Sequence, residues 1–126
     1  MGDLLALKRN GFSFKKSLQF FREDEVPADR GVMKFAFLIM GDFNIEADRA
    51  SIHDGAARIV GVASIGEAKE EALRLEREGV GCIELCGAFG EDGARAIIEA
   101  TGNRIPIGYV THFPKQDEVY RTTFSG

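Results

Sequence analysis

The stretch Gly79-Val-Gly-Cys-Ile-Glu-Leu-Cys-Gly-Ala-Phe-Gly90 decides the fold of this chain. Its first part, Val80–Cys86, is an apolar run broken by one carboxylate, which is typical of a buried strand. A glycine-rich turn, Gly87–Gly90, follows it. Glu91 and Asp92 then place acidic residues where the first turn of a helix favours them. The stretch predicts a strand, a tight turn and a helix in succession, which is the repeating unit of an α/β protein.

Apolar segments on both sides extend this unit. Lys34–Met40 is apolar without alternation, which is typical of a strand covered on both faces of a parallel sheet. Ser64-Ile-Gly-Glu67 has the spacing of a capping box, in which the serine hydroxyl and the glutamate carboxylate each accept a backbone N–H at the start of a helix. The other expected elements are strands at Ala57–Ala63 and Ile105–Thr111, helices at Ile45–His53, Ser64–Glu78 and Gly90–Thr101, and a last helix or edge strand at Asp117–Phe124. We expect an α/β fold with one compact sheet of about four to five mostly parallel strands and flanking helices.

The first thirty-two residues are patterned differently from the rest. Apolar residues in Met1–Val32 keep no steady period, and regular patterning begins at Met33. This segment is either an extension without a role in the fold or an arm whose aromatic side chains cover a sheet edge or a partner subunit. We therefore divide the chain into an N-terminal extension or arm, 1–32, and a single α/β domain, 33–126.

Composition limits the function classes. The chain has 126 residues, 44% of them hydrophobic, and a net charge of −4. A basic patch is the usual footprint of a nucleic-acid-binding protein, so this balance argues against one. Cys82 and Cys86 lie too far apart along one strand to form a disulfide, and no spacing indicates a metal site or a cofactor. Without a membrane span or a signal peptide in the sequence, we expect a cytoplasmic protein that forms a homo-oligomer through sheet edges.

In parallel sheets, ligands bind beyond the carboxyl ends of the strands, which meet at one edge. Three strand ends converge there in our interpretation, and the glycine-rich turn leads into the start of a helix that attracts anions. The alternative is that the glycines only allow a tight turn. The expected ligand-binding residues are Asp42, Gly87, Ala88, Phe89, Gly90 and Gly93.

Three side chains near this edge could carry chemistry. Cys86 next to a helix start could act as a nucleophile or base. His112 or Glu84 would be its proton-transfer partner. In the alternative interpretation Cys86 is an inert buried thiol, as we expect for Cys82, His112 is structural, and Glu84 is solvated or paired with an arginine such as Arg58 or Arg104.

The motif Ile83-Glu-Leu-Cys-Gly-Ala-Phe-Gly90, together with Arg58-Ile-Val-Gly-Val-Ala-Ser64, resembles a small family of uncharacterised prokaryotic α/β proteins. That resemblance implies the fold and no activity. A shorter likeness, at Cys86, Phe89–Gly93 and Ile105–Gly108, is to the Asp/Glu/hydantoin racemase superfamily. The chain is about half the size of those enzymes and has no second cysteine in the position of their opposing base, so two-base racemisation is not expected.

The sequence is consistent with three functions. The leading hypothesis is a domain that binds a small metabolite, either anionic or neutral, at the Cys86–Gly93 turn, although Glu91 and Asp92 count against a highly charged phosphate. The second is a cofactor-independent enzyme, either isomerase-like or thiol-dependent, that uses Cys86 with His112 or Glu84. The third is a structural or partner-binding module, which would show an exposed apolar patch.

Overall fold

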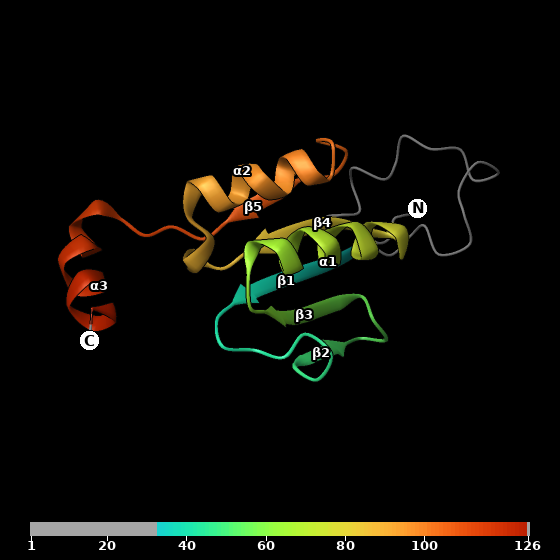
Figure 1. Cartoon of the computed structure of the whole chain (residues 1–126), viewed down its shortest axis with the longest axis horizontal. Helices are drawn as coiled ribbons and strands as arrows, with labels where there is room; N and C mark the ends of the chain where they lie inside the picture. Colours follow the sequence, from blue (N-terminus) through green and yellow to red (C-terminus); the bar gives the residue numbers. More distant parts are fainter. Residues whose placement is uncertain (1–32, 126) are drawn as a thin grey trace, which may run out of the picture. The chain divides into compact units, whose positions relative to one another are not determined.

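Five strands form one sheet in the order β2-β3-β1-β4-β5 (Figure 1). The computed structural model describes residues 33–125, and Phe35–Gly126 form one unit of the chain. The elements are β1 (Lys34–Met40), β2 (Arg49–Ile52), β3 (Ala57–Val62), α1 (Ile65–Arg77), β4 (Val80–Leu85), the 3₁₀ turn η5 (Gly87–Phe89), α2 (Gly90–Ala100), β5 (Ile107–Tyr109), the 3₁₀ turn η6 (Pro114–Gln116) and α3 (Asp117–Phe124). The expected α/β class with a mostly parallel sheet is confirmed. The expectations for residues 1–32 lie outside the described residues.

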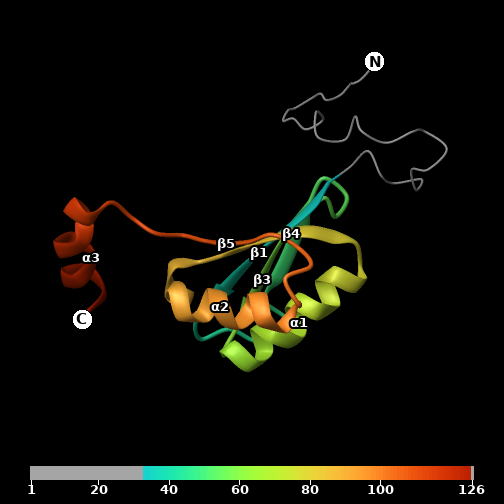
Figure 2. The same cartoon turned by 90° about the horizontal axis from the view of Figure 1, so that it is seen from above.

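Both sheet-covering helices lie on the same face of the sheet (Figure 2). The connections β3–α1–β4 and β4–α2–β5 move across the sheet in the same direction. Because crossovers between parallel strands are right-handed, both helices must then lie on one side. The chain reaches β3 through β2, which pairs antiparallel with β3 and needs no crossover helix. Within residues 33–125, therefore, no crossover helix covers the other face.

The prediction of a helix at Ile45–His53 is wrong, because the chain forms a turn there and then the strand β2. The Asn44 side-chain oxygen accepts the N–H groups of Glu46 and Ala47, at 2.8 and 3.1 Å. The Asp48 carboxylate accepts the N–H of Asn44 at 2.7 Å. Such local bonds compete with helical ones, so the segment turns toward the sheet edge.

The fourth expected strand is shorter in the structure than in the sequence analysis. It covers Ile107–Tyr109 rather than Ile105–Thr111. Pro106 has no N–H to donate, although its carbonyl accepts the N–H of Ile83 at 3.1 Å. At Asp117–Phe124, where the sequence left a helix and an edge strand open, the chain is helical.

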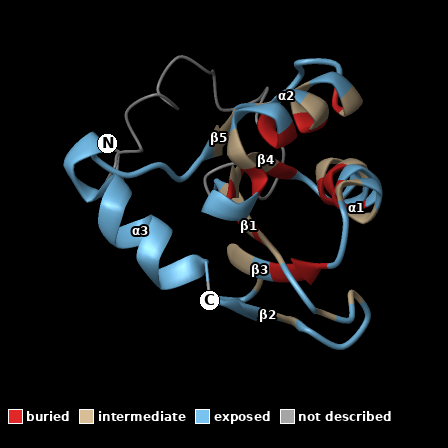
Figure 3. Cartoon of the chain, turned by 60° about the vertical axis from the view of Figure 1, so that its left-hand side comes forward, coloured by how far each residue is buried: buried red, intermediate tan, exposed pale blue. Residues whose placement is uncertain are grey.

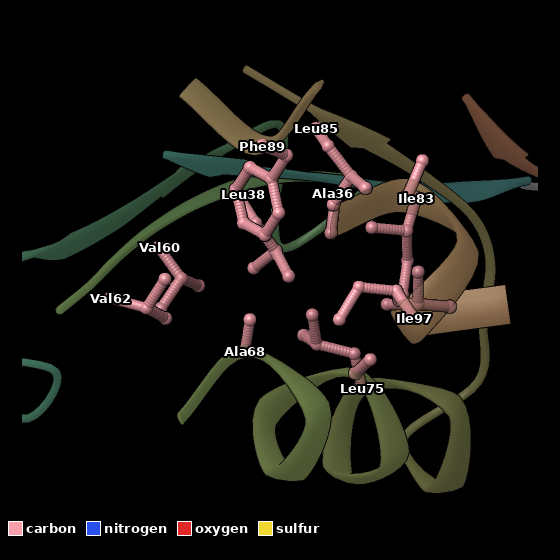
Figure 4. Close-up of a cluster of buried hydrophobic side chains, with 13 residues drawn as sticks. Ala36, Leu38, Val60, Val62, Ala68, Leu75, Ile83, Leu85, Phe89 and Ile97 are labelled. Carbon is pink, nitrogen blue, oxygen red and sulfur yellow. The ribbon is translucent and has the colours of Figure 1, made fainter. Parts of the chain in front are cut away.

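The hydrophobic core lies between the sheet and the helices α1 and α2 (Figure 4). Alternate residues of β1, β3 and β4 point into it, including Leu38 of β1 and Leu85 of β4, both fully buried. Each helix contributes one stripe, with Leu75 from α1 and Ile97 from α2. In Figure 3 the buried residues accordingly gather where the sheet meets the two helices.

The opposite face of the sheet is also apolar. Its residues alternate with the core residues along the strands, and the strand register places Phe37 beside Ile59. We call this surface the open face and define it by Phe35, Phe37, Ile39, Ile52, Ile59, Cys82 and Glu84. We expected β1 to be covered on both of its faces. The described helices cover one of them, the core face.

The capping box is present with one change. The N–H of Glu67 donates to the Ser64 hydroxyl at 3.1 Å, as expected. The Glu67 carboxylate accepts the N–H of Ala63, one residue before the cap, at 2.8 Å. The serine hydroxyl and the carboxylate therefore tie the end of β3 to the start of α1.

Replacing the cap should lower stability in a predictable way. We expect Ser64→Ala to reduce the free energy of unfolding by about 1 kcal/mol, because the N–H of Glu67 loses its acceptor. Ser64→Asp keeps an acceptor at the same position and should stay close to the wild type. Urea denaturation of the two variants measures the difference, and equal losses in both would contradict the role assigned to the hydroxyl.

Candidate functional site

The carboxyl ends of the parallel strands form one edge of the sheet, as the sequence predicts. Cys86 lies there, half-buried against the core. Its N–H donates to the carbonyl of Leu38 at 3.0 Å. Its sulfur accepts the N–H of Met40 at 3.4 Å. The end of β4 is thus fixed to β1, while Asp42 just beyond β1 is exposed.

The glycines of the following turn have structural roles. Gly90 has a φ of 65°, a conformation that residues other than glycine rarely adopt. A Cβ at Gly93 would come within 3.0 Å of the Phe89 side chain, which is itself buried. Gly87 and Ala88 are exposed and have neither constraint. The alternative that some of the glycines serve the turn is therefore supported, and ligand binding at Cys86–Gly93 stays a prediction.

His112 belongs to the segment Val110–Ser125, which we call the C-terminal arm. Its Nε2 lies 2.8 Å from a carboxylate oxygen of Asp117. Its ring stacks on Tyr120 with centroids 3.8 Å apart. Both contacts are made within the arm, whereas the sulfur of Cys86 contacts β1 of the sheet. A proton-transfer pair of Cys86 and His112 stays a prediction.

Glu84 points from β4 onto the open face. The Cys82 thiol donates to its carboxylate, with sulfur and oxygen 3.8 Å apart. It also lies over Gly108, where a Cβ would come within 2.5 Å of a carboxylate oxygen. The arginines considered as its partners pair elsewhere, Arg58 with Glu78 and Arg104 with Glu76. Burial raises the pKa of the Cys82 thiol, and the Glu84 carboxylate raises it further.

The β2–β3 hairpin forms a cleft that was not predicted from the sequence. Its volume is about 380 Å³. We call it the arginine cleft because it contains two guanidinium groups, one from each strand. It is lined by Arg49, Ala50, Ser51, Gly55, Arg58 and Val60. The alternation Arg49-x-Ser51 is a signal of a strand with a polar face, but it was hidden by the assignment of this segment to a helix.

Ion pairs to α1 hold both arginines in place. Arg49 donates to the carbonyl of Ile45 at 3.1 Å and to the Glu71 carboxylate at 2.9 Å. Arg58 donates to the carbonyl of Gly55 at 3.2 Å and to the Glu78 carboxylate at 2.5 Å. The exposed fractions of the two arginine side chains are 30% and 20%, so both remain accessible from the cleft.

Glu71 is the buried charge of this region. Its side chain has no exposed area, and one carboxylate oxygen, Oε1, has no hydrogen-bond partner. The nearest cation to that oxygen is the Arg74 guanidinium, at 3.6 Å. Burying a carboxylate without enough hydrogen-bond partners costs free energy. Glu71 therefore depends on the arginines beside it. The ion pairs of this region thus join three arginines (49, 58 and 74) to two glutamates (71 and 78).

No group of three His, Cys, Asp or Glu side chains among residues 33–125 could hold a metal ion. None of the helices described in that range is long and apolar enough to cross a membrane.

Residues 33–125 match a family of unknown function (DUF6506), and the chain belongs to this family. The expectation of an uncharacterised family that begins at Met33 is confirmed to that extent. No significant match was found among curated proteins or among solved structures. The short likeness to racemases has no further support.

The two cysteines should react differently with an alkylating reagent. Because burial and the Glu84 carboxylate raise the Cys82 pKa, the pH midpoint of its alkylation should be higher in the folded chain than in the unfolded chain. Glu84→Gln removes one of the two causes, so the midpoint should move down while remaining above the unfolded value. Mass spectrometry after labelling over a pH series measures both.

Glu99→Gln, at an exposed position on α2, is the matched control and should leave the Cys82 midpoint unchanged. A midpoint that stays in place in Glu84→Gln would contradict the assigned contact. The same experiment reports on Cys86, whose rapid labelling well below the free-thiol value of about 8.5 would support thiol chemistry.

Proposed function

We propose that this domain binds a small anionic metabolite and that the arginine cleft holds its carboxylate or phosphate group. One observation carries the proposal. Arg49 and Arg58 enter the same cleft from neighbouring strands, and each guanidinium has five N–H donors, of which described residues engage two. The remaining donors suit the paired oxygens of an anion.

Charge and size support the same class of ligand. The charged residues that line the cleft are both cations, which favours an anion over a neutral or cationic molecule. Pockets for small molecules are usually about 300–1,000 Å³, so a cleft of about 380 Å³ fits a metabolite rather than a polymer. The exposed hydroxyl of Ser51 adds a donor that can also accept.

The lining favours binding over catalysis. It provides two cations and a hydroxyl, but none of the lining residues is a histidine, a cysteine or a carboxylate that could move a proton. The nearby carboxylates of Glu71 and Glu78 are already engaged by arginines. We therefore propose a binding domain, with the ligand held by ion pairs at the hairpin.

Thiol-dependent chemistry at Cys86, with His112 or Glu84 as partner, is a second candidate. The observation in its favour is the bond from the Met40 N–H, which fixes the sulfur at the edge where parallel sheets present ligands. The labelling experiment above distinguishes this candidate from the binding function, because slow labelling of Cys86 would indicate that its sulfur has only a packing role.

Anion titration followed by two-dimensional ¹H–¹⁵N NMR tests the binding function. With inorganic phosphate or malonate as the probe, the amide signals of residues 49–51, 55 and 58 should shift and saturate at constant ionic strength. Arg58→Gln should weaken binding by roughly tenfold or more, because a charge-assisted pair of hydrogen bonds is lost. Arg58 is the better choice because its partner Glu78 is 44% exposed, whereas replacing Arg49 would leave the buried Glu71 charge without its closest partner.

Arg95→Gln is the matched control, because Arg95 is an exposed arginine on α2 that also pairs with carboxylates. It should bind the probe like the wild type. Shifts that do not saturate, or that are unchanged in Arg58→Gln, would exclude the arginine cleft as the anion site. Thermal unfolding of each variant verifies that a loss of binding is not a loss of fold.

A further inference from the structure

We propose that two copies of this chain exchange C-terminal arms, so that α3 of each copy packs on the open face of the other copy's sheet. The proposal rests on surfaces outside the arginine cleft and is independent of anion binding. It names one partner, a second copy of the same chain, and two surfaces that this partner would cover.

The first surface is the arm itself. None of its described residues is buried, and Figure 3 shows it exposed along its whole length. The exposed fractions of Phe113, Tyr120 and Phe124 are 74%, 40% and 78%. Tyr120 and Phe124 are one turn apart on α3, and their rings stack with centroids 5.9 Å apart. The arm thus presents an aromatic ridge.

An unsupported helix of this length should not persist. α3 has eight residues, and isolated helices shorter than about 12–15 residues are marginal in water. Its charged residues already pair inside the arm, Asp117 with His112 and Glu118 with Arg121. With these charges paired, what remains for a partner is the aromatic ridge. The helix therefore requires an apolar surface to pack on.

The second surface is the open face of the sheet. Parallel strands are normally covered on both sides, and the residues of β1 on this face are as apolar as those of its core face. Ile59 is 42% exposed and Ile52 70% exposed, although both lie in strands. Glu84 is the one carboxylate on this surface as defined above, and its partner there is the Cys82 thiol. An aromatic ridge is the kind of partner that such a surface accepts.

A second copy accounts for both surfaces at once. In a two-fold dimer each arm covers the open face of the partner, so the arm and the open face of both copies are all buried. The family match spans residues 33–125, so the unit that defines the family contains the arm and the open face but not Met1–Val32.

The area is also sufficient. An aromatic side chain buries about 150–250 Å², so the exposed parts of the three rings offer roughly 400 Å² per arm. The sheet surface they cover and the second arm bring the total to about 1,500 Å². Stable interfaces bury about 1,200–2,000 Å².

Mass measurement of the full chain by light scattering after size exclusion tests the exchange. The wild type should have twice the chain mass of 13.8 kDa. Tyr120→Glu/Phe124→Glu, which charges the ridge, and Ile59→Glu, which charges the open face, should each halve the measured mass while circular dichroism keeps the folded spectrum. Thr122→Glu, on the side of α3 away from the ridge, is the matched control and should remain dimeric.

Mixing the two monomeric variants identifies the exchange itself. The Ile59→Glu chain has an intact arm, and the Tyr120→Glu/Phe124→Glu chain has an intact open face. An equimolar mixture restores one of the two contacts, so it should form a heterodimer more weakly than the wild type but at chain concentrations at which neither variant alone dimerises. A monomeric wild type, a dimer that survives the ridge substitutions, or a mixture that forms no heterodimer over a concentration series would overturn the proposal. A dimer lost on deleting residues 1–32 but kept in Tyr120→Glu/Phe124→Glu would assign the contact to the N-terminal segment instead and equally overturn it.

Discussion

The handedness of the crossovers is the constraint on which the rest of the structure depends. Two right-handed connections that move in the same direction must place α1 and α2 on the same face of the sheet. The single core between that face and the helices follows directly. So does the absence of a crossover helix from the other face within residues 33–125, because the chain reaches β3 by an antiparallel edge strand. The asymmetry of the molecule is thus set by topology before any side chain is considered.

The edge hairpin illustrates how packing and charge act together. β2 has four residues and one hydrogen-bonded neighbour, so backbone pairing alone holds it weakly. Arg49 and Arg58 connect the hairpin to α1 through Glu71 and Glu78. Because Glu71 is fully buried, its pairing with Arg49 fixes the hairpin more firmly than a surface ion pair would. The cations that stabilise the hairpin are the same ones that line the cleft.

Much of the fold was predictable from the sequence, because the strongest patterns there are local. The run Lys34–Met40 and the capping box at Ser64 were placed correctly, since apolar continuity and cap chemistry operate within a few residues. The segment 45–53 was not, because its strand character comes from pairing with β3 and from bonds made by Asn44 and Asp48. The arginine cleft was missed for the same reason, as Arg49 and Arg58 become neighbours only through that pairing. The residues assigned to the glycine turn do lie at the strand ends, but which of them serve a ligand depends on contacts that the sequence does not contain.

The two proposals meet at β2, which serves both faces of the sheet. Arg49 and Ser51 lie opposite Val60 and Arg58, on the side of the helices, whereas Ile52 lies opposite Ala57 on the open face. Successive side chains of this short strand point to opposite faces of the sheet. The side chains proposed to bind an anion and the proposed dimer surface are therefore separated by the thickness of a single sheet. A substitution on one face therefore leaves the side chains of the other face in place, and the two proposals stand on separate surfaces.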